Sequence, residues 1–137
     1  MDRRVVLKND VRSMGDQGFL CLNEKSEDGF GTKVLLDAYR DVQMVVYVTG
    51  SPSFTLKWWV SDDNDPDFSG TETITNKRYN PSAYELNEAI TPITEKEIDT
   101  AGTYMFTVNT YGQKFINLEV SGHTGGTVSA WIKGYNS

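Results

Sequence analysis

The chain has 137 residues, enough for one domain whose core needs neither a disulfide nor a structural metal. Its formal net charge is −6, with 13 Lys and Arg against 19 Asp and Glu, which argues against binding to nucleic acid and to an anionic membrane surface. One cysteine excludes an internal disulfide, and one histidine leaves no His/Cys cluster for zinc.

The first forty residues hold short apolar pieces with glycines and charges scattered among them. The segment 1–8, MDRRVVLK, is too polar for a secretory signal, whose apolar region needs about 7–15 residues, so we expect synthesis in a reducing cytosol. We interpret residues 1–40 as an extended N-terminal arm with edge strands and residues 41–137 as the main domain.

From residue 42 to residue 60, apolar side chains alternate with other side chains, which is the period of a strand with one buried face. The turn residues 50–52, Gly-Ser-Pro, divide this stretch into two predicted strands. We predict a hairpin centred on Ser51, in which Val48 lies opposite Phe54. The side chains expected to face inward are Val42, Met44, Val46, Val48, Phe54, Leu56, Trp58 and Val60.

An acidic stretch, DDNDPD, follows at residues 62–67. The spacing of its alternate carboxylates resembles the first ligands of a calcium loop, but Phe68 and Ile74 stand where that loop needs Gly and Glu. We interpret the stretch as a solvated loop, and a bound Ca²⁺ is the alternative. The candidate ligands are Asp63, Asp65 and Asp67, and no other cofactor is expected.

The C-terminal part repeats the period of two at residues 104–108, 116–120 and 128–132. We predict a second hairpin centred on Thr124, with Val120 opposite Val128. Many short strands separated by turns, with no convincing helix of ten residues, indicate an all-β fold: an antiparallel β-sandwich of jelly-roll or immunoglobulin-like type. Shorter runs predict further strands at residues 5–7, 18–22, 33–36, 71–75 and 84–90.

No group of residues indicates catalysis, so we expect that the protein is not an enzyme. Cys21 lies in an apolar run and is interpreted as a small buried strand residue, while His123 lies in a glycine-rich turn. Glutamates such as Glu85 and Glu97 are expected on solvated strand faces or in loops.

Two tryptophans fall on outward-facing positions of the predicted strands. Trp59 lies beside Thr55 and Lys57, and Trp131 lies between Ser129 and Lys133 on the same side of its strand. Three interpretations remain: the chain covers these rings itself, a neighbouring subunit covers them, or they form a ligand platform together with Tyr47. Interfaces between proteins are enriched in Trp and Tyr.

Two stretches carry a resemblance. The first is FTLKWWVSDD, residues 54–63; the second runs from DTAGTY at 99–104 through YGQKFINLEV at 111–120 to TGGTVSA at 124–130. They resemble a strand followed by Ser-Asp-Asp, and a C-terminal pair of hairpins, in small β-sandwich virion proteins of tailed bacteriophages. The segment AGTY at 101–104 also resembles the tyrosine corner of immunoglobulin domains, whose paired cysteines are absent here.

The phage resemblance implies a non-enzymatic capsid decoration or cement protein that binds and stabilises the shell of the major capsid protein. It further implies a homo-oligomer, often a trimer, that is made in the host cytoplasm and resides in the virion. The alternatives are a structural protein of the phage tail or neck, and a carbohydrate-binding module that uses Trp59, Trp131 and Tyr47. No nucleic acid and no membrane are expected as partners.

Overall fold

The computed structural model describes residues 18–36, 39–86 and 91–134. Within these ranges the regular elements are strands alone, and they pair antiparallel, which confirms the predicted all-β class. In the same ranges no helix is long and apolar enough to span a membrane. The strands are β1 (Phe19–Lys25), β2 (Gly29–Phe30), β3 (Val34–Leu35), β4 (Asp41–Ser61), β5 (Ala83–Glu85), β6 (Glu95–Ile98), β7 (Gly102–Asn109) and β8 (Phe115–Gly134).

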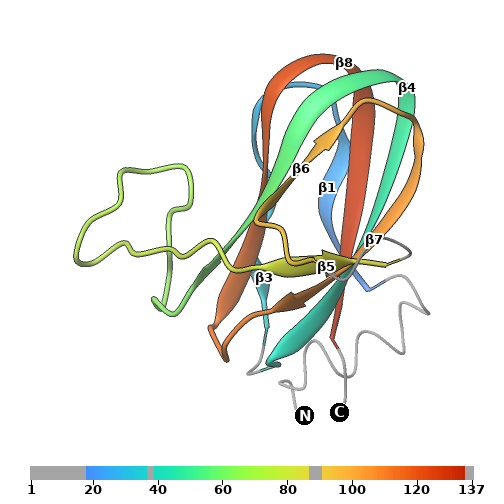
Figure 1. Cartoon of the computed structure of the whole chain (residues 1–137). Coiled ribbons are helices and arrows are strands. Elements are labelled where there is room, and N and C mark those ends of the chain that lie inside the picture. Colours follow the sequence, from blue (N-terminus) through green and yellow to red (C-terminus); the bar gives the residue numbers. More distant parts are fainter. Residues whose placement is uncertain (1–17, 37–38, 87–90, 135–137) are drawn as a thin grey trace.

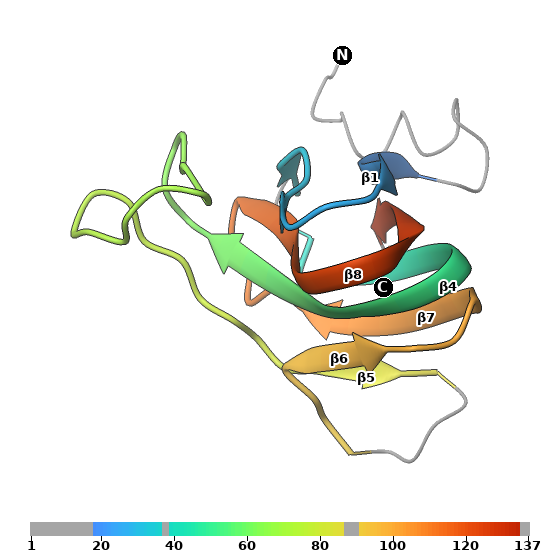
Figure 2. The same ribbon diagram turned by 90° about the horizontal axis from the view of Figure 1, so that it is seen from above.

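Two long strands, β4 and β8, organise the fold. They have 21 and 20 residues and pair antiparallel along almost their whole length, from Val42 opposite Gly134 to Ser61 opposite Phe115. Both strands curve over in the middle, where the register shifts between Thr49 and Thr55. One hydrogen-bonded sheet therefore folds over itself into two layers (Figures 1 and 2).

We call the two halves of this sheet layer A and layer B. Layer A contains the beginning of β4 and the end of β8, with β7 and then β5 on one side and β1 on the other. Layer B contains the end of β4 and the beginning of β8, with β6 on one side and β2 and β3 on the other. The result is a sandwich whose layers share their two central strands.

The side chains between the layers form one hydrophobic core. Trp58 of layer B packs against Phe106 of layer A, with ring centroids 5.4 Å apart. The indole Nε1 of Trp58 donates a hydrogen bond to the carbonyl of Pro81 at 2.6 Å, so its polar atom is satisfied although the ring is fully buried. All eight residues predicted to face inward between positions 42 and 60 are buried, which confirms the parity of the alternation.

The two predicted hairpins are wrong. Val48 pairs with Val128 rather than with Phe54, and Val120 pairs with Leu56. A period of two determines which face a side chain occupies, but it is preserved equally when a strand bends and when it reverses. In this structure the glycines of the two predicted turns allow β4 and β8 to bend side by side while they stay paired, and the register is irregular at the bend.

Residues 18–36 pair with β8 along the edge opposite β4, and their apolar side chains complete the core. β1 pairs with the end of β8, and β2 and β3 pair with its beginning. Four of their side chains are buried in the shared core: Cys21, Leu22, Val34 and Leu36. Residues 1–17 of the predicted arm lie outside the described residues.

Candidate functional site

The outer face of layer A carries a row of apolar side chains that crosses four strands. Leu20 of β1 lies opposite Trp131 of β8, Trp131 lies opposite Val45 of β4, and Val45 lies opposite Met105 of β7. Side chains directly opposite on one face of an antiparallel sheet are close enough to pack together. The row therefore forms a continuous apolar band across the outside of the sandwich.

A shallow recess of about 380 Å³ lies on this band, and we call it the Trp131 hollow. Its apolar members are Val45, Tyr47, Met105 and Trp131, and its polar members are Gln43, Thr103 and Lys133. Tyr47 is 51% exposed, although it is a large aromatic side chain. An open apolar recess rimmed by polar groups is typical of a binding surface.

The structure brings Trp131 and Tyr47 together but places Trp59 elsewhere. Trp59 lies on the outer face of layer B and is partly buried. The Nζ of Lys57 lies 4.6 Å from its ring centroid and the guanidinium carbon of Arg78 lies 5.0 Å from it. Its Nε1 donates to the Oε1 of Glu119 at 3.0 Å. The chain itself thus covers Trp59, and the covering segment is the one that follows β4.

That segment, residues 62–80, extends away from the two layers as a long loop (Figures 1 and 2). The side chain of Asn76 organises it: its Nδ2 donates to the carbonyls of Asp67 at 2.9 Å and Thr71 at 3.1 Å, and its Oδ1 accepts from the Asp67 N–H. Thr73 and Asn76 close a turn with two backbone hydrogen bonds. The predicted strand over residues 71–75 is therefore wrong, since side-chain bonding to the backbone overrides the β-preference of the threonines.

Ile74 stands at the tip of this loop and is 85% exposed. Its carbonyl accepts a hydrogen bond from the Nζ of Lys77 at 3.0 Å. The backbone of the tip is thus held in place while the apolar side chain points away from the chain. Sequence reasoning missed this feature, because it predicted that the segment would belong to a sheet.

The three candidate calcium ligands do not form a cation site. Asp63 pairs with the Nζ of Lys77 at 3.0 Å and Asp65 pairs with the Nζ of Lys33 at 2.5 Å. Asp67 accepts from the hydroxyl of Ser69 at 2.9 Å. Across the described ranges, no three His, Cys, Asp or Glu residues are grouped in a way that could hold a metal ion. The carboxylates of this loop bind its own chain instead.

Two of these carboxylates are held in the ionised form. A hydrogen bond from the backbone N–H of Lys77 lowers the pKa of Asp63, and the Lys77 ammonium lowers it further. The Lys33 side chain lowers the pKa of Asp65 in the same way, by hydrogen bond and by charge. Both carboxylates therefore act as attachment points of the loop at neutral pH.

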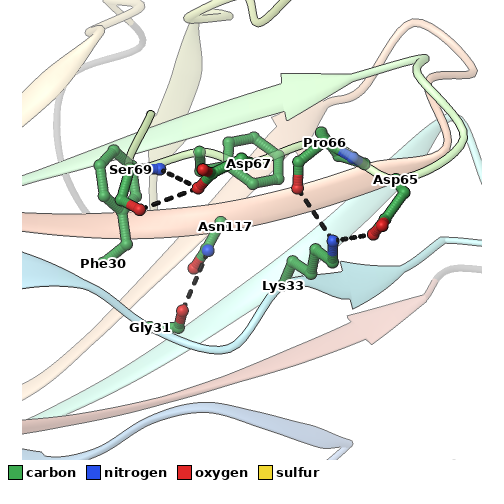
Figure 3. A pocket seen from close by; sticks show the side chains of 9 residues that line it. Phe30, Gly31, Lys33, Asp65, Pro66, Asp67, Ser69 and Asn117 are labelled. Atoms are coloured by element: carbon green, nitrogen blue, oxygen red, sulfur yellow. Dashed lines mark hydrogen bonds and ion pairs between the residues drawn. The ribbon is translucent and has the colours of Figure 1, made fainter. Parts of the chain in front are cut away.

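A second recess, of about 430 Å³, lies where this loop meets the sandwich (Figure 3). Lys33 enters it and is held by Asp65 and by the carbonyl of Pro66 at 2.9 Å. At its floor the buried Asn117 donates to the carbonyl of Gly31 at 3.0 Å. The polar groups of this recess satisfy one another, so we interpret it as the seam that attaches the loop to layer B.

Cys21 and His123 have separate surroundings. Burial raises the pKa of the Cys21 thiol to about 12, and its Sγ lies 3.4 Å from the Oδ1 of Asn117. His123 lies at the bend of β8, stacks on Phe54 and has its Nε2 2.8 Å from the Gly126 carbonyl. A thiol so rarely ionised is a poor nucleophile at neutral pH.

The sequence matches no known protein family and none of the curated protein sequences. A solved structure similar to this chain is that of the SPBc2 prophage-derived protein YomS. The two share 17% sequence identity with a TM-score of 0.59, over 83% of this chain and 88% of the other. This likeness shows a shared fold.

Proposed function

We propose that this protein is a non-enzymatic structural component of a bacteriophage particle: a capsid decoration protein that binds and stabilises the shell of the major capsid protein. The observation that carries the proposal is the Trp131 hollow, an open apolar surface on a rigid sandwich. Such a surface is suited to contact with another protein. The fold shared with a prophage-derived protein supports the phage setting.

In this proposal the protein stabilises the shell by binding to it, without any chemical reaction. A protein that attaches to the assembled shell and not to free capsid subunits stabilises the shell by mass action. The net charge of −6 keeps it from associating with the packaged genome. An oligomer would hold the shell at several points at once, and such multivalent attachment raises the overall affinity by about 10²–10⁴. In this proposal the protein is made in the host cytoplasm and resides in the virion.

Co-sedimentation with purified shells that lack the protein tests the proposal. We expect the wild type to pellet with the shells at a fixed ratio and to raise their melting temperature. Tyr47→Glu places a charge in the Trp131 hollow and should weaken pelleting, whereas Thr124→Asp, an acidic change at an exposed position of the β8 bend, should not. A wild type that stays in the supernatant overturns the capsid role, and a position at the tail or neck in cryo-electron microscopy would replace it.

A carbohydrate-binding module is the second candidate, and one observation favours it. Tyr47 and Trp131 line the same recess together with the polar Gln43, Thr103 and Lys133, and flat aromatic rings beside hydrogen-bonding groups suit a sugar ring. Binding to a glycan array that is lost in Trp131→Ala would support this function. Array binding without shell binding would place it ahead of the capsid role.

A further inference from the structure

We propose that the Trp131 hollow is filled by the Ile74 loop tip of a second copy of this chain, so that the subunits join head to tail. This inference rests on the proposed function and assigns the hollow to the contact between subunits: the oligomer that the hollow builds is then what attaches to the shell at several points, and Tyr47→Glu weakens pelleting because it dissociates that oligomer. It goes further by naming the partner and the residue that enters the hollow.

The first argument is chemical complementarity. Ile74 is an apolar side chain that is 85% exposed, and the hollow presents Val45, Met105 and Trp131 in a recess of about 380 Å³. The recess is large enough to take the tip of a turn as well as one side chain. Burial of apolar surface from both partners is the dominant driving force of protein association.

The second argument is that the tip is already ordered. Two backbone hydrogen bonds between Thr73 and Asn76, of 3.0 and 3.1 Å, close the turn, and Lys77 holds the carbonyl of Ile74. A loop fixed in its bound form loses little conformational freedom on docking, so more of the contact energy appears as affinity. Turn tips usually carry polar residues, and a rigid tip with an isoleucine is suited to insertion.

The third argument is charge. Glu72 lies two residues before Ile74, and Lys133 belongs to the hollow. Over the residues that the structure describes, neither takes part in an ion pair. Docking of the tip brings the Glu72 carboxylate to the Lys133 ammonium group, which favours the correct orientation.

The contact has to be made between chains. The loop leaves the sandwich from the end of β4 in layer B and extends away from both layers (Figures 1 and 2). The residues that line the hollow lie on strands of layer A. A tip that binds a different patch on the next copy gives a heterologous interface, which produces a ring when the rotation closes. Each subunit then contributes one tip and one hollow.

Analytical ultracentrifugation of the isolated protein, without shells, tests this arrangement. We expect the wild type to self-associate and Ile74→Asp to weaken self-association by about 30-fold or more, the loss typical of a central interface residue. Because Ile74 is exposed, this variant should unfold as the wild type does at a protein concentration at which both are monomeric. Tyr47→Glu, which alters the hollow, should have the same effect, and Thr124→Asp should associate as the wild type does.

Mixing the two defective variants gives a sharper test. Ile74→Asp keeps an intact hollow and Tyr47→Glu keeps an intact tip, so an equimolar mixture should form heterodimers but no larger species. A two-fold symmetric dimer would also regain one of its two contacts in this mixture, so the size of the wild-type assembly separates the two arrangements: a symmetric interface stops at a dimer, whereas a head-to-tail interface continues beyond it. The proposal is overturned if the wild type is monomeric or if Ile74→Asp associates as tightly as the wild type. Shell binding is measured separately, so the capsid role and this interface can fail independently.

Discussion

The guanidinium group of Arg78 lies against the ring of Trp59, with its central carbon 5.0 Å from the ring centroid. The same group donates hydrogen bonds to the carbonyls of Phe68 and Gly70. Arg78 therefore fastens the loop of residues 62–80 to the outer face of layer B. Its buried Nε has no hydrogen-bond partner in the described part of the chain, a cost that the stacking and the two carbonyl bonds offset.

We expect Arg78→Lys to loosen this loop, because an ammonium group cannot stack in a plane and reach two carbonyls at once. The free energy of unfolding in urea should fall by about 1–2 kcal/mol. Trypsin should cut after Lys77 faster than in the wild type. Arg40→Lys makes the same exchange at an exposed position and should change neither quantity. Equal cutting rates in the two variants would show that Arg78 does not fasten the loop.

Two glycines in the bend of β8 allow the cost of a left-handed backbone conformation to be measured apart from the cost of a steric clash. Both have positive φ, +79° at Gly126 and +64° at Gly122. A Cβ added at Gly126 would lie 2.7 Å from the Thr49 carbonyl oxygen and 2.8 Å from the Pro52 Cα, whereas one added at Gly122 would meet nothing within 4 Å. Of these two positions, Gly126 is the one at which a Cβ would obstruct the close approach of β4 and β8.

Gly122→Ala should therefore lower the free energy of unfolding by about 1–2 kcal/mol, because alanine disfavours the left-handed backbone conformation. Gly126→Ala should cost clearly more, because backbone atoms of β4 must also move apart. Urea unfolding of both variants measures the difference. Equal losses would mean that the bend tolerates separation of the two strands.

The Asp63–Lys77 contact predicts a pH dependence. The pKa of Asp63 is lowered from its ordinary value of 3.8, so its contribution is present above that value and is lost as the pH falls through the lower pKa of the folded state. Asp63→Asn should lower the melting temperature at pH 7, and the difference from the wild type should shrink in acid. Asp62→Asn, an exposed neighbour, should match the wild type throughout. A difference that does not shrink at all as the pH falls below the ordinary pKa of 3.8 would point to another cause.

The sequence predicted the buried face well and the strand pairing poorly. Alternation along residues 42–60 assigned Met44 and Trp58 to the core, and both are fully buried. The same alternation could not tell a hairpin at Ser51 from a bend there, because both keep the parity. The choice depends on whether β4 pairs with itself or with β8, and that information lies in contacts between distant segments.

The candidate site was predicted in part. Parity placed Tyr47 and Trp131 outside, but only the register between β4 and β8 brings them into one hollow. Trp59 has the same outward parity and is covered by Arg78, which no periodic pattern indicates. The exposure of Ile74 depends on the Asn76 hydrogen bonds, because without them its threonine neighbours favour a strand.

Cysteine cross-linking provides a direct test of the proposed contact between copies. Burial raises the pKa of Cys21 to about 12, so the native thiol stays protonated and shielded. New cysteines at exposed positions should thus react alone. In an equimolar mixture of Ile74→Cys and Tyr47→Cys, with oxidised glutathione as the oxidant, we expect a disulfide between the two variants.

The docked arrangement holds the two new thiols together at a high effective concentration, so this disulfide should form at least about tenfold faster than in a mixture of Thr124→Cys and Tyr47→Cys. Thr124 is exposed at the β8 bend and belongs neither to the loop of residues 62–80 nor to the lining of the hollow, which makes it a matched control. Non-reducing gel electrophoresis measures the rates. If both mixtures cross-link equally slowly, Ile74 does not enter the Trp131 hollow, and the hollow is then free for the capsid shell or for a sugar.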